Sequence, residues 1–143
     1  MKQPIDWQNK YPLACVGGFY KEFNAGWDKI VCDMFDKIEP VLQDIYTLEP
    51  EKSQELENQF RVAQIKEKFA SLRVYIDYPN FWVDQYKDKC ETIQSAIRTA
   101  GDLSTETCEL CGEAGKVVGT GWLSCRCAKC NNYKLIESEK TND

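Results

Sequence analysis

Four cysteines near the carboxyl end of the chain carry the clearest chemical signal in the sequence. They form two C-x-x-C pairs, Cys108 with Cys111 and Cys127 with Cys130. Zinc prefers four sulfur or nitrogen ligands in a tetrahedral arrangement, and two such pairs on separate turns supply them. The sequence therefore predicts one structural zinc ion, held by these four thiolates in a small zinc ribbon.

A fifth cysteine, Cys125, stands two residues before Cys127 in the stretch CRCAKC. A C-x-C pair has poorer turn geometry than C-x-x-C, so we expect Cys125 to lie under the ribbon, outside the ligand set. A substitute ligand and a redox-active thiol are the alternatives. Between the two pairs, glycines at 112, 115, 119 and 121 surround an apolar centre, which predicts two short hairpins.

No pattern in the sequence predicts catalysis. The chain contains no histidine, and four thiolates leave no open position on a zinc ion for water. Carboxylate pairs such as Asp33 with Asp36 are typical of solvated helix faces. Cys15, Cys32 and Cys90 stand in apolar contexts typical of a core. We therefore expect no catalytic residue and no enzymatic activity.

The length and composition predict one ordinary core with a small additional module. The chain has 143 residues, of which 43% are hydrophobic, enough for one core. It contains neither a secretory apolar run nor a membrane-spanning one, so a reducing cytosol is expected, where paired cysteines favour metal over disulfides. The predicted division is a body over residues 1–104, a zinc ribbon over 105–136 and a flexible tail over 137–143.

The predicted fold class is α+β, with a mainly helical body, a small β-hairpin or strand element and the carboxy-terminal zinc ribbon. Apolar residues from Trp27 to Ile45 recur with helical spacing. Asn24 is the expected cap of this helix, and Pro40 predicts a kink or a break within it. Residues 51–60 are polar and helix-prone. A further helix is predicted after Asn80, over residues 82–100, with Gly101 as its terminator.

The segment between these helices is ambiguous. Leu72, Val74 and Ile76 alternate with polar residues, which predicts a strand over 72–77. Residues 61–69 are interpreted either as the end of a helix or as the partner strand of a hairpin.

Charge is distributed unevenly along the chain. The net charge of −5 weighs against sequence-independent binding to phosphates. Acidic side chains concentrate in residues 22–57, whereas residues 58–73 carry four basic residues and one acidic residue. The candidate partner-binding residues are Asp33, Asp36, Asp44, Glu49, Glu51 and Glu55. The candidate nucleic-acid contacts, in the alternative interpretation, are Arg61, Lys66, Lys68 and Arg73.

Three stretches together resemble small, largely uncharacterised phage and prophage proteins with a carboxy-terminal zinc ribbon. They are Gly26-Trp27 before DKIVCDMFDKIE, the segment KEKFASLRVY at 66–75, and CELCGEAGKVVGTGWLSCRCAKC at 108–130. The resemblance implies that Cys127 and Cys130 form the final ligand pair. This chain departs from the pattern at Ala70, where glycine is usual in a tight hairpin turn.

The resemblance implies an accessory protein in the cytosol of a bacterial host, without implying a mechanism. The expected function is non-enzymatic binding of a bacterial protein or protein complex, as an inhibitor of a defence system (an anti-CRISPR-like role) or of a nucleic-acid machine. The acidic residues would recognise a basic partner surface. The alternative is a nucleic-acid-binding regulator, because zinc ribbons are common in transcription and replication proteins. No membrane association is expected.

Overall fold

The computed structural model describes residues 4–131 and has the α+β class that the sequence predicts. The predicted tail, residues 137–143, and residues 132–136 of the predicted ribbon lie outside the described residues. In chain order the elements are α1 (Trp7–Lys10), β1 (Tyr20–Glu22), η1 (Ala25–Trp27), α2 (Asp28–Leu48), η2 (Lys52–Gln54), η3 (Leu56–Asn58), β2 (Arg61–Lys68), β3 (Ser71–Asp77), α3 (Trp82–Gln85), α4 (Lys87–Ser104), β4 (Lys116–Val118) and β5 (Ser124–Arg126).

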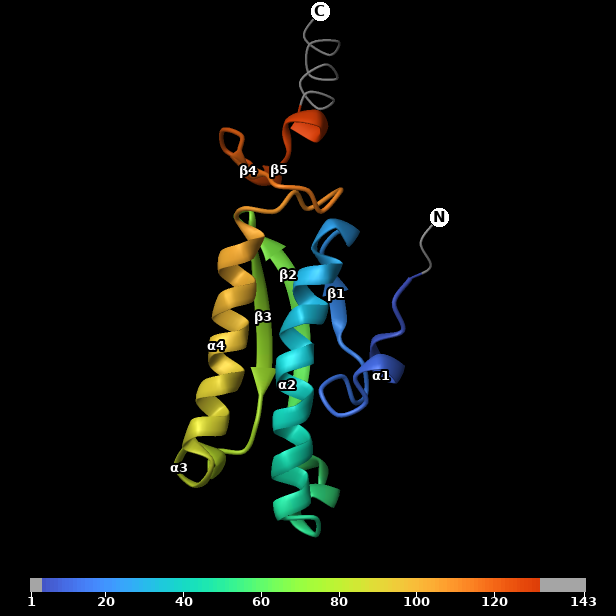
Figure 1. Ribbon diagram of the computed structural model, residues 1–143, viewed down its shortest axis with the longest axis vertical. Coiled ribbons are helices and arrows are strands. Elements are labelled where there is room, and N and C mark those ends of the chain that lie inside the picture. Colours follow the sequence, from blue (N-terminus) through green and yellow to red (C-terminus); the bar gives the residue numbers. More distant parts are fainter. Residues whose placement is uncertain (1–3, 132–143) are drawn as a thin grey trace, which may run out of the picture.

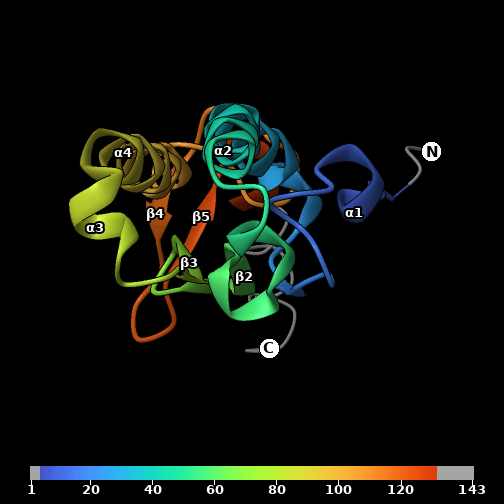
Figure 2. The same cartoon turned by 90° about the horizontal axis from the view of Figure 1, so that it is seen from below.

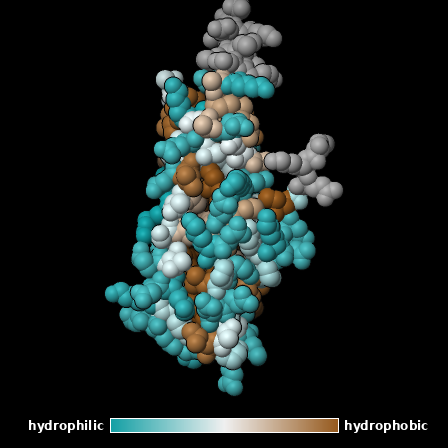
Figure 3. All heavy atoms as spheres, in the orientation of Figure 1, coloured by the Kyte–Doolittle hydropathy of each residue, from teal (hydrophilic) through white to brown (hydrophobic). Residues whose placement is uncertain are grey.

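Three strands form a sheet that the two long helices cover on one face (Figures 1 and 2). Strand β2 lies in the middle, antiparallel to β3 and parallel to β1. Helices α2 and α4 pack against each other, and α4 also packs against β3. The core between these layers includes Trp27, Phe35, Val62, Ile65, Leu72 and Ile93. The view in Figure 3 is largely hydrophilic, with separate hydrophobic spots.

Helix α2 confirms the apolar stripe that the sequence predicts. Its buried residues are Ile30, Val31, Met34, Phe35, Ile38, Leu42 and Ile45. Pro40 lies inside this helix and does not break it. Because Pro40 is on the exposed side, water can hydrate the carbonyl that loses its usual partner to proline. In residues 4–131 no helix combines the length and the apolar character needed to cross a membrane.

Two predictions about helix ends differ from the structure. Asn24 stands at the N-cap position of η1, which leads into α2, but its side chain makes no capping hydrogen bond; its amide donates instead to Glu109 Oε1 at 3.3 Å. Gly101 does not terminate α4, which continues to Ser104. The Ser104 hydroxyl donates to the Gly101 carbonyl and accepts from the Leu72 amide. These bonds fix the last helical turn against β3, so tertiary contacts extend the helix past the glycine.

Two further segments differ from a simple helical interpretation. The polar residues 51–60 form two short 3-10 turns, η2 and η3, instead of an α-helix. The helix predicted over 82–100 is divided into α3 and α4 at Tyr86, which has a non-helical backbone (φ −125°, ψ 47°). Tyr86 is buried and its ring packs edge-on against Trp82. Burial of this aromatic pair is the physical reason for the interruption.

Residues 61–77 form the hairpin that was one of the two interpretations. Strand β2 pairs with β3 through a two-residue turn at Phe69 and Ala70. Both turn residues have positive φ, 52° for Phe69 and 65° for Ala70. Asn-Gly is the sequence usually found in such turns, since other residues lose about 1–2 kcal/mol each in this conformation. A tight turn therefore forms despite the alanine at position 70.

Candidate metal centre

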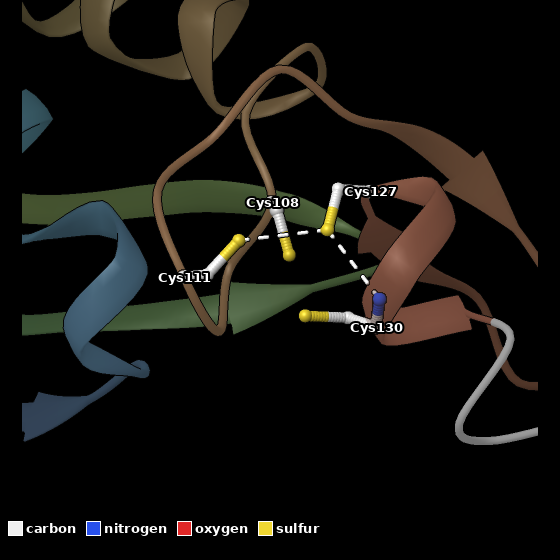
Figure 4. Close-up of side chains that lie close together, drawn as sticks. All are labelled: Cys108, Cys111, Cys127 and Cys130. Atoms are coloured by element: carbon white, nitrogen blue, oxygen red, sulfur yellow. Dashed lines mark hydrogen bonds between the residues drawn. The ribbon is translucent and has the colours of Figure 1, made fainter.

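The structure brings together the four cysteines that the sequence predicts as metal ligands. Cys108 and Cys111 lie in the turn that follows α4, and Cys127 and Cys130 lie at the turn that follows β5. Their four Sγ atoms all lie within 4.8 Å of one another (Figure 4). Cys111 Sγ and Cys127 Sγ are 3.5 Å apart. These four side chains could bind a metal ion.

Backbone amides prepare two of the sulfurs for the thiolate form. Burial opposes ionisation of Cys108, yet hydrogen bonds from the backbone of Cys111, Cys127 and Leu110 lower the pKa of its thiol to about 6. The backbone N–H of Cys130 lies 3.4 Å from Cys127 Sγ and lowers the pKa of Cys127. Protein donors that stabilise thiolates favour metal binding, because the thiolate is the ligand.

The pKa values of the other two thiols, Cys111 and Cys130, are raised. Hydrogen bonding to the neighbouring sulfurs of Cys127 and Cys108 raises the pKa of Cys130 to about 12. A cation at the centre of the cluster would compensate the charge of four thiolates and allow all of them to form. The electrostatics therefore suit a cation bound among the four sulfurs.

The first turn depends on a glycine. Gly112 has φ +83°, a left-handed conformation that glycine adopts without steric cost, and its N–H donates to the Cys108 carbonyl at 2.9 Å. The segment between the cysteine pairs forms one hairpin, β4 with β5, and an isolated bridge between Thr107 and Ala114. The predicted pair of hairpins is thus one hairpin plus one bridge.

Cys125 lies outside the sulfur cluster, on β5. Its side chain is fully buried among the core residues of the body. Burial raises the pKa of this thiol. Cys125 lies within β5, whereas Cys127 follows Arg126, the last residue of that strand. The strand geometry therefore does not put the two side chains on one face, and Cys125 lies in the core while Cys127 lies in the cluster.

Backbone hydrogen bonds fasten the first cysteine turn to the start of α2. The Gly26 N–H donates to the Glu109 carbonyl at 2.9 Å, and Trp27 Nε1 donates to the Thr107 carbonyl at 2.8 Å. Trp27 is completely buried. The Gly26-Trp27 dipeptide therefore connects the helical body to the cysteine cluster.

Gly26 lets the chain before α2 approach the backbone of the first cysteine turn more closely than a residue with a Cβ atom would allow. A Cβ atom at this position would lie 2.4 Å from the Cys108 carbonyl oxygen. We expect Gly26→Ala to lower the free energy of unfolding by about 1–3 kcal/mol, because backbone atoms cannot yield as a flexible side chain can. Urea denaturation measures the difference.

Gly101→Ala is the matched control. The new Cβ would lie 3.7 Å from the Leu72 carbonyl oxygen, an ordinary contact, within helix α4, where alanine is favoured over glycine by about 0.5–1 kcal/mol. The two glycine substitutions are thus expected to have opposite signs. Equal effects at both positions would show that Gly26 is not under steric pressure.

A buried ion pair joins the two cysteine turns and was missed at the sequence level. Arg126 Nη1 lies 2.5 Å from Glu109 Oε1, and the two side chains are only 12% and 8% exposed. Each residue is adjacent to a cysteine of the cluster, Glu109 to Cys108 and Arg126 to Cys127. Nothing in the sequence distinguishes these charges from surface charges, because their burial depends on how the turns dock.

Four of the six candidate acidic residues already have partners within the chain. The contacts are Asp33 with Lys29, Asp36 with Tyr11, Glu49 with Gln85 and Lys52, and Glu55 with Asn58. Asp44 and Glu51 are exposed and, within residues 4–131, form neither an ion pair nor a side-chain hydrogen bond. These two carboxylates are therefore the most available for an external partner.

The four candidate basic residues all lie in the hairpin of β2 and β3. The register pairs Lys66 with Arg73 across the two strands, and Lys68 with Ser71. Within the described part of the chain, none of the four basic side chains lies within 4.0 Å of a carboxylate oxygen. The hairpin thus carries four basic side chains without a direct ion pair, although Asp77 stands opposite Arg61 in the register.

Comparison with models of protein families, with curated proteins and with solved structures found no match to this chain. The resemblance to small phage and prophage proteins therefore depends on the three sequence motifs alone.

Proposed function

We propose that the four cysteines hold one zinc ion with a structural role. Zinc–sulfur bonds of about 2.3 Å in a tetrahedron place the sulfurs about 3.8 Å apart. The observed sulfurs, all within 4.8 Å of one another, fit this arrangement with small adjustments. Since four protein thiolates complete the tetrahedron, the ion has no position for a substrate or a reacting water. The single observation that carries this proposal is the convergence of the four Sγ atoms.

The zinc ion in this proposal stabilises a binding protein that performs no catalysis. Cys108 and Cys111 come from the turn after α4, and Cys127 and Cys130 follow β5, so one ion cross-links the two ends of the ribbon. The ribbon has few buried apolar residues of its own, and small metal domains of this kind depend on the ion for their folding. Through Gly26 and Trp27 the ion also supports the start of α2.

The partner in this proposal is a bacterial protein or complex with a basic surface, such as a component of a defence system or a nucleic-acid machine. Support comes from the sequence resemblance and from the carboxylates of α2 and the following turn. Asp44 and Glu51 are the two that have no intrachain partner among residues 4–131. Opposite charges on two surfaces direct association and specificity.

Reversal of the charges of Asp44 and Glu51 tests whether these residues recognise the partner. Full-length tagged protein is used to capture interacting proteins from bacterial lysate after nuclease treatment. We expect a stoichiometric protein partner with the wild type and its loss with the double variant Asp44→Lys, Glu51→Lys. The matched control, Asp88→Lys with Asp102→Lys on α4, should retain the partner. Equal capture by both double variants would refute recognition through Asp44 and Glu51.

Nucleic-acid binding is a second candidate function, favoured by one specific observation. The four basic residues Arg61, Lys66, Lys68 and Arg73 lie together in one hairpin without carboxylate partners in the described chain. A local positive surface can bind phosphates even when the net charge of the chain is negative. Retention of a labelled oligonucleotide at low salt, with loss at high salt, tests this function.

A further inference from the structure

The outer face of the three-stranded sheet, turned away from α2 and α4, combines exposed aromatic rings with basic side chains. We call this surface the open sheet face. Pairing register assigns its members, since residues opposite one another in a ladder point to the same side of a sheet. One row across the strands is Tyr75, Gln64 and Tyr20, and the next is Arg73, Lys66 and Glu22. Lys68 and Ser71 form the last row before the turn.

The aromatic members are unusually accessible for their size. Tyr20 is 70% exposed, Tyr75 is 43% exposed, and Phe69 in the hairpin turn is 66% exposed. The opposite side of the same strands is apolar and buried, with Val62, Ile65 and Leu72 in the core. The exposed rings therefore do not belong to the core and are accessible from solvent.

Basic groups lie beside these rings. Lys66 Nζ is 5.7 Å from the centre of the Tyr75 ring, and Lys68 Nζ is 5.7 Å from the centre of the Phe69 ring. The nearest acidic member of the face, Glu22, accepts a hydrogen bond from Gln64 Nε2 at 2.9 Å. Two of the three rings, Tyr75 and Phe69, thus have a neighbouring cation that could bind a phosphate while the ring contacts a base.

The turn that presents Phe69 is held in a costly conformation. Phe69 has φ 52°, which the two-residue turn requires, and most of its side chain is in water, so packing of the Phe69 ring itself does not compensate the strain. Residues in sparsely populated backbone regions are concentrated at functional sites. The strained, exposed ring is a second observation, independent of charge, that points to a ligand at this end of the open sheet face.

We propose that the open sheet face binds single-stranded nucleic acid, with bases stacked on Tyr20, Tyr75 and Phe69 and phosphates bound by Lys66, Lys68 and Arg73. Bases of a single strand are free to stack on aromatic side chains, whereas those of a duplex are not. Successive rows of the sheet are about 7 Å apart, so a strand can place neighbouring nucleotides on different rows. This inference rests on the second candidate function and specifies its ligand.

Fluorescence anisotropy of the full-length zinc-loaded protein tests the proposal. The probes are a labelled 12-nucleotide mixed-sequence DNA single strand, the same RNA sequence, and the DNA duplex. We expect either single strand to bind at least tenfold more tightly than the duplex. Tyr75→Leu should weaken single-strand binding by about 5- to 150-fold, the range found for one base stacked on an aromatic side chain.

Variants of charge and of stacking should differ in their salt dependence. The double variant Lys66→Ala, Arg73→Ala should reduce the slope of log affinity against log salt by about 1.4, because each lost phosphate contact on a single strand removes about 0.7. Tyr75→Leu should leave that slope unchanged. The control, Lys87→Ala with Arg98→Ala on α4, removes the same charge from the other side of the molecule and should change neither affinity nor slope.

Phe69→Asn separates function from folding. Asparagine tolerates positive φ, so we expect the melting temperature to rise by about 2–5 °C while single-strand affinity falls at least fivefold. A variant that is more stable yet binds less tightly cannot be explained by damaged folding. Unchanged affinity for Phe69→Asn and Tyr75→Leu would overturn the proposal.

The remaining outcomes separate the inference from the function on which it rests. Equal or tighter binding to the duplex would overturn the single-strand inference and leave nucleic-acid binding in place. Absence of binding to all three probes at about 20 mM salt, where charges are only weakly screened, would overturn both. Retention of a protein by the open sheet face, without any oligonucleotide affinity, would equally contradict the proposal.

Discussion

Cys108→Ser protein is expected to lose its zinc ion and to unfold the two cysteine turns, while the core between α2, α4 and the sheet stays folded. Structural zinc contributes about 10–16 kcal/mol of apparent binding free energy in small zinc modules, far more than the short hairpin of β4 and β5 can supply. The body retains its own core around Phe35, Ile65 and Ile93. Loss of structure should therefore be local.

Hydrogen exchange followed by mass spectrometry measures this result segment by segment. Peptides covering residues 105–131 should exchange fully in Cys108→Ser protein. Gly26 should also lose protection, because its backbone N–H donates to the Glu109 carbonyl in the folded state. Peptides from the middle of α2 and from α4 should remain protected.

Two other cysteines serve as matched controls for that experiment. Cys32→Ser removes a thiol from α2, far in sequence from the cluster, and Cys125→Ser removes the buried thiol of β5. Both variants should retain one equivalent of zinc. A Cys108→Ser protein that keeps both its zinc and its protected ribbon would refute the structural assignment.

Arg126→Ala is expected to lower the free energy of unfolding by about 3–5 kcal/mol, because it leaves the buried Glu109 carboxylate without its counter-charge. The Glu109 side chain is 8% exposed, and its Oε2 atom has no hydrogen-bond partner in the described chain. An isolated charge in that position has neither water nor a cation to stabilise it. Urea denaturation with saturating zinc measures the loss while keeping metal binding constant.

The double variant Glu109→Leu, Arg126→Leu should cost less than either single change, since no unpaired charge remains. The exposed pair of Lys29 and Asp33 is the control: its side chains are 85% and 48% exposed. Asp33→Ala should change stability by less than about 1 kcal/mol. If Arg126→Ala costs no more than Asp33→Ala, the buried pair does not hold the cysteine turns together.

Patterns within short stretches of sequence correctly predicted the cysteine cluster, helix α2 and strand β3. The C-x-x-C spacing predicted which sulfurs converge, because each pair needs only one turn to come together. The apolar stripe from Ile30 to Ile45 predicted α2, and the alternation of Leu72, Val74 and Ile76 predicted β3. In each case the signal lies within about twenty consecutive residues.

Features that depend on contacts distant in sequence could not be predicted in this way. Gly101 looked like a helix terminator, but Ser104 bonds to β3 and continues the helix. Nothing in the sequence indicated that Glu109 and Arg126 are buried, because their burial depends on the packing of the two cysteine turns against each other. The open sheet face requires Tyr20 to pair with Gln64, a parallel register between segments more than forty residues apart, and no local pattern reports it.

The metal content and coordination of the purified full-length protein test the central claim most directly. X-ray absorption spectroscopy at the zinc edge, combined with elemental analysis, gives the ion, its stoichiometry and its ligands. The account predicts one zinc ion per chain with four sulfur ligands at about 2.3 Å. Protein that contains no zinc, or zinc with oxygen ligands in place of sulfur, would contradict it.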